Sequence, residues 1–367
     1  MHILSFTNGV EFTFDKSGGP RRTIVPPYQD YVFSNIQRIH GSTQPHLNEQ
    51  LFRQSYLEAR VPAFRVNPLG GKGERLLFYT GSGGYGDQLM AWPVCKLLHK
   101  LGYVVDVLVD PGNEPCWQEL DFIRKTITLP APLGDLYEYH HCALYEFVTN
   151  ADGHPGQMHP TDNILFRMGL EPKTVPHEDK RVATPFTVLE QMSGEAWKDV
   201  CLYQLASSNP LRNLSPDATV ALLRRLREET KLEWVAIADR YLPKPYYEVC
   251  EREKIEYKFF PDIRELMAAA VNAKMAVGPD SFMTHLRGQN LKKGVFYFGT
   301  LEPELRLAYY PTVTGIWNKA VCHLSPCHLY TNSFPPWCPT KDTGHCGVIS
   351  SAPELIFKAT IDCLQSS

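Results

Sequence analysis

The stretch from Leu76 to Asp110, LLFYTGSGGYGDQLMAWPVCKLLHKLGYVVDVLVD, decides the fold. An apolar, strand-forming run ends at Thr80, a glycine-dense turn follows, and a helical pattern continues to Gly102, where a second strand begins. This order predicts a β-loop-α-β unit. Glycines let the backbone approach a ligand closely, and amides at a helix start favour negative charge, so we expect an anion or a substrate oxygen here. The turn contains Gly81, Gly83, Gly84 and Gly86.

Two kinds of ligand are compatible with this turn. GSGGYG satisfies the dinucleotide pattern G-x-G-x-x-G, and Asp110 at the end of the second strand is placed to hold a ribose. Against this interpretation, the carboxylate of Asp87 directly follows the last glycine and would repel a pyrophosphate, and Pro93 lies early in the helix. Asp87 is also a good helix-capping residue, which is a purely structural alternative.

Length and composition indicate an ordinary globular protein of two main domains. The chain has 367 residues, of which 43% are hydrophobic and 21% are charged. A net charge of -3 and a pI near 6.5 give no general attraction to nucleic acid or anionic membrane. The sequence contains no long uncharged apolar run and no secretory signal pattern, so we expect a cytoplasmic protein without a transmembrane segment.

The order of expected elements divides the chain into four parts. Residues 1–72 consist of short strands and loops and form an N-terminal extension, for which a dimerisation arm, an acceptor-recognition element and a cover for a sheet edge are all compatible roles. Residues 73–187 and 188–352 each alternate strands with helices and predict two Rossmann-like α/β domains. Residues 353–367 form a closing amphipathic helix.

The helix opening resembles that of a known family. The run GDQLMAWPVCKLL is similar to the G-D-x-L-x-x-x-P-x-x-x-x-L opening of the ADP-heptose-type glycosyltransferases, which have the GT-B fold. This resemblance implies two nucleotide-fold domains that face each other across a cleft, with the closing helix returning to the first domain. It also implies that Asp87 is the catalytic base on the acceptor hydroxyl, with Gly84 and Gly86 on the acceptor side.

A second segment, MAVGPDSFMTHLRGQNLKKGVFYFG, resembles the part of the family that lies under the diphosphate of the nucleotide sugar. The family pattern is G-x-D-[ST]-G-x-x-H followed by a helix, a strand and F-G. A hydroxyl, backbone amides and a histidine at a helix start can stabilise phosphate oxygens, although Phe282 replaces the family's glycine. The structural alternative is an ordinary helix cap with a packed histidine. The matching donor-binding residues are Gly278, Asp280, Ser281, His285 and Gly299.

The loop LASSNPLRNLSP resembles the family's phosphate-gripping loop, which has two hydroxyl residues and a lysine. Ser207 and Ser208 match the hydroxyls, and Arg212 occupies the lysine position. A permanently charged, bidentate arginine can neutralise a leaving diphosphate without a divalent metal, which agrees with the absence of a D-x-D motif. A solvated arginine in a polar loop is the alternative.

The segment NADGHPGQMHPTDNILFRMGL carries three further candidates. His154, His159 and Asp162 lie ahead of a short amphipathic helix, and an acceptor-side role is compatible with them. Loop residues of these types are more often caps or solvated side chains, which is the structural alternative.

Four of the ten cysteines lie close together in the sequence. Cys322, Cys327, Cys338 and Cys346 follow a C-x4-C-x10-C-x7-C spacing in a loop rich in proline. Four thiolates can surround one tetrahedral ion, so the spacing predicts a structural metal site, with zinc as the general expectation and iron as the one that the resemblance implies. Free thiols are the alternative. Two disulfides would need an oxidising compartment.

The motifs together predict an inverting, metal-independent glycosyltransferase of the hexosyl- or heptosyltransferase type. The donor would be a nucleotide-diphosphate sugar, and the acceptor hydroxyl could belong to a saccharide, a protein or a modified DNA base. An NAD- or FAD-dependent oxidoreductase that uses GSGGYG, and a non-catalytic, metal-clamped nucleotide-sugar-binding protein, are the alternatives. A homo-oligomer is compatible with the sequence.

Overall fold

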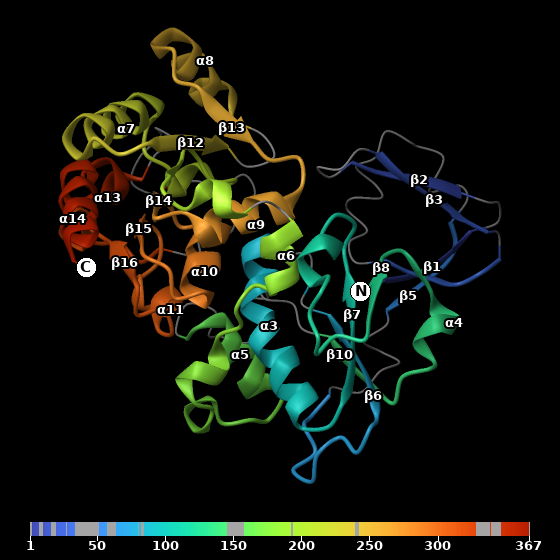
Figure 1. The fold of residues 1–367 in the computed structure, drawn as a ribbon. Helices are drawn as coiled ribbons and strands as arrows, with labels where there is room; N and C mark the ends of the chain where they lie inside the picture. The colour runs from blue at the N-terminus through green and yellow to red at the C-terminus, as the bar shows by residue number, and fades with distance from the viewer. Residues whose placement is uncertain are drawn as a thin grey trace. The chain divides into compact units, whose positions relative to one another are not determined.

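The computed structural model of the protein describes residues 2–6, 10–15, 20–26, 28–33, 51–56, 64–79, 81, 84–144, 158–191, 194–238, 242–327, 338 and 346–366. The chain divides into two compact units (Figure 1). The first comprises residues 1–149 and 160–179, and the second comprises residues 150–159 and 180–367. The predicted boundary at residues 187 and 188 therefore falls inside the second unit. No helix in the described ranges is long and apolar enough to cross a membrane.

The first unit contains a parallel sheet with the strand order β10-β6-β7-β8. Strands β6, β7 and β8 confirm the strands that the runs LLFYT, VVDVLV and TITLP predict, whereas β10 was not predicted. Helix α3 (Tyr85–Lys100) connects β6 to β7 and keeps Pro93 buried within it. Its first turn carries Asp87 and its last turn Lys100, charges that suit the helix dipole. The strands are β6 (Arg75–Tyr79), β7 (Val104–Val109), β8 (Lys125–Thr128) and β10 (His141–Leu144), and the other described helices of this unit are α4 (Leu133–Leu136) and α5 (Pro160–Arg167).

The N-terminal residues form strands, as predicted. A second sheet of this unit has the order β5-β1-β4-β9, and its pairings are antiparallel. Strand β9 comes from the chain that follows β8, so the extension is joined to the α/β part by backbone pairing between Tyr31 and Pro132. The strands are β1 (His2–Phe6), β2 (Val10–Asp15), β3 (Pro20–Val25), β4 (Tyr31–Phe33), β5 (Leu51–Tyr56) and β9 (Ala131–Pro132), of which β2 and β3 form a separate hairpin.

The second unit is built on a six-stranded parallel sheet with the order β13-β12-β11-β14-β15-β16. The chain runs outward from β11 to β13 and then returns to place β14 beside β11. Ligands of such sheets bind beyond the carboxyl ends of the strands where this reversal occurs. The strands are β11 (Cys201–Gln204), β12 (Trp234–Ala238), β13 (Tyr257–Phe259), β14 (Met275–Pro279), β15 (Gly294–Tyr297) and β16 (Val313–Ile316).

Helices α7 and α9 confirm the helices that the segments DATVALLRRLREET and DIRELMAAAVNA predict. Helix α7 is capped by the Ser215 hydroxyl and buries Val220, Leu222, Leu223 and Leu226, as expected from its sequence. Asp262 caps α9 through the backbone N–H of Arg264. The described helices are α6 (Phe186–Gln191), α7 (Pro216–Thr230), α8 (Lys244–Glu253), α9 (Ile263–Asn272), α10 (Phe282–Gln289), α11 (Glu304–Leu307), α13 (Gly347–Ser350) and α14 (Pro353–Gln365).

The closing helix α14 corrects one expectation. It was expected to return to the first domain, but it belongs to the second unit and packs against α7, β15 and β16 (Figure 1). Its fully buried Ile356 joins the hydrophobic core of that unit. On its exposed side, Glu354 pairs with Arg225, whose guanidinium lies 3.6 Å from the centre of the Phe357 ring. The apolar face of α14 is thus satisfied within the second unit.

A fully buried arginine fixes the end of helix α10. Arg287 donates from Nη1 to the carbonyls of Ala270 and Ala273 at 2.6 Å each, and from Nε to the carbonyl of Lys293 at 2.9 Å. Burial lowers the pKa of Arg287 to about 9, which leaves it charged at neutral pH. Since these carbonyls belong to the end of α9 and to the residue before β15, one side chain ties three elements together.

Replacing Arg287 by methionine should destabilise the protein strongly. The variant leaves several buried carbonyls without donors, and hydrogen bonds to a charged group contribute about 1.5–3 kcal/mol each, so we expect a loss of at least about 3 kcal/mol. Urea unfolding measures it. The control is Arg224→Met, because Arg224 pairs with Glu253 on the surface and such pairs contribute at most about 1 kcal/mol. Equal losses in the two variants would contradict the assigned role.

Candidate functional site

The glycine turn of the first unit leads from β6 into helix α3. Gly81 has a φ of +88°, a conformation that favours glycine, and Gly84 is the exposed residue that precedes the helix. The carboxylate of Asp87 accepts a hydrogen bond of 2.8 Å from the backbone N–H of Gly84. Asp87 therefore caps α3, as the structural alternative predicted, and this cap fixes the half-buried carboxylate beyond the carboxyl end of β6.

The other candidates of the first half are distributed differently. Gly86 lies within the first turn of α3, and Asp162 is half-buried in the first turn of α5. Residue His154 lies outside the described residues, as does Gly83. Asp110, which the dinucleotide interpretation needs at a ribose, is fully buried. A ligand could reach its carboxylate only after rearrangement of this part of the unit.

In the second unit, hydrogen bonds between residues of the loop after β11 hold that loop in its conformation. Asn213, which is 1% exposed, accepts hydrogen bonds from the backbone N–H of Ser207 at 2.8 Å and from its hydroxyl at 2.9 Å, and it donates to the Ser207 carbonyl at 3.0 Å. The hydroxyl of Ser207 thus stabilises the loop, while Ser208 is exposed. Asn213 was missed in the sequence because an asparagine in a polar loop gives no distinctive signal.

The loop after β14 is joined to this first loop through Gln204. The hydroxyl of Ser281 caps α10 at Met283 and donates a 2.6 Å hydrogen bond to Oε1 of Gln204. Nε2 of Gln204 donates in turn to the carbonyl of Ala206. Gly278 is required here, since a Cβ on it would lie 2.8 Å from Cβ of Gln204. Gln204 was also missed, because nothing in the strand pattern distinguishes it from an ordinary strand end.

These two loops bring three of the predicted side chains together at the point where the strand order reverses. Nη1 of Arg212 lies 3.6 Å from Oδ2 of Asp280, and the Asp280 side chain is 5% exposed. Nε of Arg212 and Nδ1 of His285 are buried and have no hydrogen-bond partner among the described residues. Among the described residues the only ion pair of Arg212 is this long contact to Asp280, which leaves Arg212 able to take an anionic ligand.

Two histidines of this region are neutral. Burial, together with the charges of Arg306 and Arg212, lowers the pKa of His285 to about 4, although Asp280 opposes the shift. Burial also lowers the pKa of His159 well below its usual value, with contributions from His285 and Arg306. His159 belongs to the second unit and thus lies with the residues expected to hold the donor.

The cysteine-rich segment lies beside the end of β15. The backbone N–H of Cys327 donates to the carbonyl of Thr300 at 3.0 Å, and a Cβ on Gly299 would lie 2.9 Å from Sγ of Cys346. Gly299 therefore allows close packing of this segment.

The four thiols interact electrostatically. Burial, followed by the effects of Cys346, Cys338 and Cys322, raises the pKa of Cys327 to about 11. Even so, within the described ranges no three His, Cys, Asp or Glu side chains are grouped closely enough to hold a metal ion.

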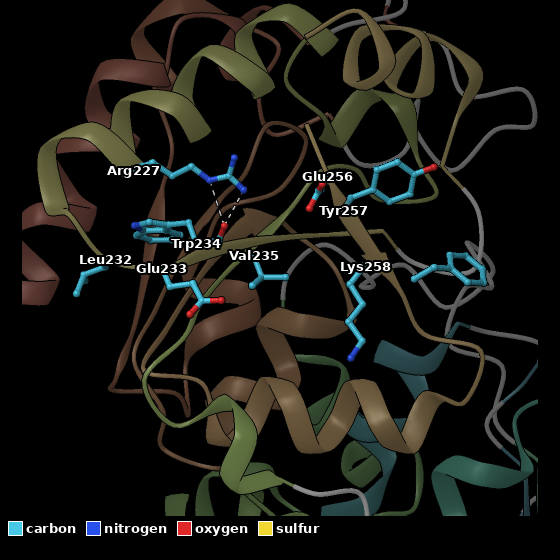
Figure 2. Close-up of a pocket in the computed structure, with 9 residues that line it drawn as sticks. Arg227, Leu232, Glu233, Trp234, Val235, Glu256, Tyr257 and Lys258 are labelled. Carbon is cyan, nitrogen blue, oxygen red and sulfur yellow. Dashed lines mark hydrogen bonds between the residues drawn. The ribbon is translucent and has the colours of Figure 1, made fainter. Parts of the chain in front are cut away.

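A separate cavity of about 700 Å³ lies at the opposite end of the second sheet (Figure 2). It is lined by residues at and before the starts of β12 and β13, where Arg227 donates to the Trp234 carbonyl at 2.8 Å. The positive charges of Arg227 and Lys258 in its lining are balanced by the negative charges of Glu233 and Glu256. The cavity therefore has no charge preference for an anion. Because ligands of parallel sheets bind at the carboxyl ends, this cavity is not the expected nucleotide site.

Two parallel sheets, each with a candidate site where its strand order reverses, define an α/β protein of two Rossmann-like units. No protein-family model matches the sequence, and no curated protein sequence matches it. Solved structures do match. A glycosyl transferase family 9 structure from Veillonella parvula is 13% identical, with a TM-score of 0.56 and coverage of 82% of this chain and 99% of that chain.

Two structures from E. coli give similar results. The ADP-heptose lipopolysaccharide heptosyltransferase II is 11% identical, with a TM-score of 0.55 and coverage of 79% and 98% of the two chains. The iron-containing dodecameric glycosyltransferase TibC is 12% identical, with a TM-score of 0.58 and coverage of 95% and 86%. The resemblance to heptosyltransferase-type glycosyltransferases is thus confirmed for the fold, which is GT-B-like.

The neutral state of His285 predicts a pH dependence of stability. Its pKa is about 4 in the folded protein and about 6.5 in the unfolded chain, so below pH 6.5 only the unfolded chain takes up the proton. Stability is therefore lost as the pH falls from about 6.5 to about 4, by up to about 3 kcal/mol from this residue.

Urea unfolding at several pH values between 7 and 4 tests this expectation. The variant His285→Asn should lose less stability across the window than the unchanged protein, because it has no imidazole to protonate. His99→Asn, at an exposed position on α3, is the control and should leave the slope unchanged. An identical slope for His285→Asn would show that His285 does not contribute.

Proposed function

We propose that the protein is an inverting glycosyltransferase that moves a sugar from a nucleotide-diphosphate sugar to an acceptor hydroxyl. One observation carries the proposal: Arg212, His285 and the capped start of α10 lie together where the strand order of the second sheet reverses, with buried polar atoms of Arg212 and His285 lacking partners among the described residues. A diphosphate supplies the oxygens that such donors bind.

The donor would be held by the second unit. Arg212 binds the diphosphate with its guanidinium, Ser208 and the amides at the start of α10 bind further oxygens, and neutral His285 donates one hydrogen bond. When the bond between the anomeric carbon and the phosphate oxygen breaks, the charge that develops on the diphosphate is stabilised by Arg212. The mechanism that we propose uses no divalent metal.

The acceptor would be activated by Asp87 of the first unit. Its carboxylate takes the proton of the acceptor hydroxyl while the oxygen attacks the anomeric carbon from the face opposite the diphosphate, which inverts the configuration. The hydrogen bond from Gly84 holds the carboxylate in place for this step. The acceptor itself is proposed only as a hydroxyl-bearing molecule.

The variant Asp87→Asn should lower the rate of transfer at least about a hundredfold, because it removes the general base. Folding and donor binding should stay nearly intact, since an asparagine oxygen can still accept the hydrogen bond from Gly84. The rate of sugar transfer from the donor to the acceptor measures the effect. The melting temperature is the control for folding. Full activity of the variant would remove Asp87 from the mechanism.

Ligand screening tests the function as a whole. Nucleoside diphosphates and their sugar derivatives should raise the melting temperature, whereas NAD and FAD should not. Mass spectrometry of the ligands that co-purify with the protein identifies the nucleotide and the sugar. Stabilisation by NAD or FAD alone would favour the oxidoreductase alternative, and binding of a sugar nucleotide without transfer or hydrolysis would favour a binding protein.

We also propose a structural metal at Cys322, Cys327, Cys338 and Cys346. The mutual electrostatic effects of these thiols support it, as does the iron content named for TibC. Thiolates suit zinc or iron, and four of them would stabilise the loop by binding energy that contributes to folding. A closed shell of four thiolates leaves no position for substrate.

Elemental analysis of the purified protein should find about one equivalent of zinc or iron. Cys327→Ser should lower the metal content and the melting temperature together, whereas Cys95→Ser, at a buried cysteine of α3, should leave the metal content unchanged. Metal-free protein with unchanged stability and four titratable thiols in this segment would refute the proposal.

We also propose a compartment and an assembly. We propose a cytoplasmic protein, because the single buried thiols of Cys95, Cys116, Cys142, Cys201 and Cys250 fit a reducing compartment. The dodecameric state named for TibC supports a homo-oligomer. Gel filtration with light scattering would measure the assembly.

A further inference from the structure

We propose that the edge strand β13 of the second sheet is an interface between two copies of this chain, which pair antiparallel about a two-fold axis at Tyr257. The inference does not depend on the proposed sugar transfer, and it gives the proposed homo-oligomer a defined surface. Strand β13 lies at the end of the sheet and pairs only with β12 among the described strands. The backbone N–H and C=O groups on its outer side can therefore pair with a further strand.

The charges beside Tyr257 determine both the partner and the register. Glu256 and Lys258 flank Tyr257, and residues two apart in a strand point to the same face of a sheet. In an antiparallel pair with the axis at Tyr257, Glu256 of each copy lies directly opposite Lys258 of the other. Moving the axis to position 256 or 258 places two glutamates or two lysines opposite each other, which is unfavourable. Of these three registers, only the one centred on Tyr257 makes the strand complementary to itself.

Both charges are free to form this contact. Glu256 and Lys258 are exposed, and neither forms an ion pair in the described part of the chain. The ammonium of Lys258 lies 4.5 Å from the centre of the Trp197 ring and 5.2 Å from that of the Phe260 ring, which keeps the side chain beside the strand. Side chains that lie directly opposite each other in an antiparallel pair have Cβ atoms about 4.5–5.5 Å apart, so a salt bridge can form between them.

The space along β13 is open, and exposed aromatic rings lie beside it. The cavity of about 700 Å³ is lined by Glu256 and by all three residues of β13 (Figure 2). Tyr257 packs on the α8 side of the sheet against the core that includes Val249, and Phe259 points to the same side by alternation. Phe259 is 44% exposed, and Tyr247 of α8 is 47% exposed. A second copy would bury these rings and so add apolar area to a short strand pairing.

A second copy fits this edge better than an unrelated strand. Charged side chains on an edge strand oppose pairing with any chain that does not match their charges. A two-fold interface uses the same surface on both copies, so each contact between Glu256 and Lys258 occurs twice. The charges that protect β13 from other strands therefore favour pairing with its own copy.

Charge exchange at the two positions tests the interface, with sedimentation equilibrium of the full-length protein as the measurement of association. Lys258→Glu and Glu256→Lys each place like charges opposite each other twice, so each should weaken association at least about tenfold. An equimolar mixture of these two variants should associate again, because one copy then carries two lysines and the other two glutamates. The double variant, which has both exchanges in one chain, should associate like the unchanged protein.

The control is Lys292→Glu, which reverses an exposed lysine before β15 on the other side of the sheet and should leave association unchanged. If a charge reversal does not fold, Lys258→Gln, which removes both salt bridges without repulsion, should still weaken association. A monomeric unchanged protein would refute the interface. Association that survives both single reversals would show that the copies pair through another surface. Single variants that stay apart when mixed would refute the pairing of residues 256 and 258.

Discussion

The buried guanidinium of Arg287 is the constraint on which the second unit depends. It binds carbonyls at the end of α9 and before β15, so the carboxyl-terminal end of α10 cannot shift along the sheet. At the other end, Ser281 is held by Gln204 of β11. A helix fixed at both ends places its first amides within a small range of positions, and anion binding at a helix start requires this precision.

The sequence predicted the architecture well because the strands and helices have clear periodicities. The glycine turn, the strands of the second sheet and the inward face of α7 all follow from local patterns. Helix α14 was assigned to the wrong unit, since an amphipathic face shows that a helix is covered but not which surface covers it. Strand β10 was missed because HCAL is short and is preceded by polar residues.

The candidate site was predicted only in part. The motifs identified Arg212, Asp280 and His285, which the structure brings to one edge, but they assigned the hydroxyls of Ser207 and Ser281 to a ligand. In the structure both hydroxyls also bind neighbouring side chains. Gln204 could not be found from the sequence, because its contact with Ser281 forms only when β14 pairs beside β11. Asn213 was missed for another reason, because its bonds to Ser207 lie within one polar loop where an asparagine gives no distinctive signal. Roles that arise from long-range pairing have no local signature.

The close approach of Gly278 to Gln204 also restricts how this sequence can change over evolutionary time. A side chain at position 278 would collide with Cβ of residue 204, and a smaller residue at 204 would release Ser281 from its partner. A substitution at either position alone therefore disturbs the packing or the hydrogen bond of the other. Homologues that keep this loop arrangement should therefore carry the two residues as a pair, and exchanges at the two positions should be found together.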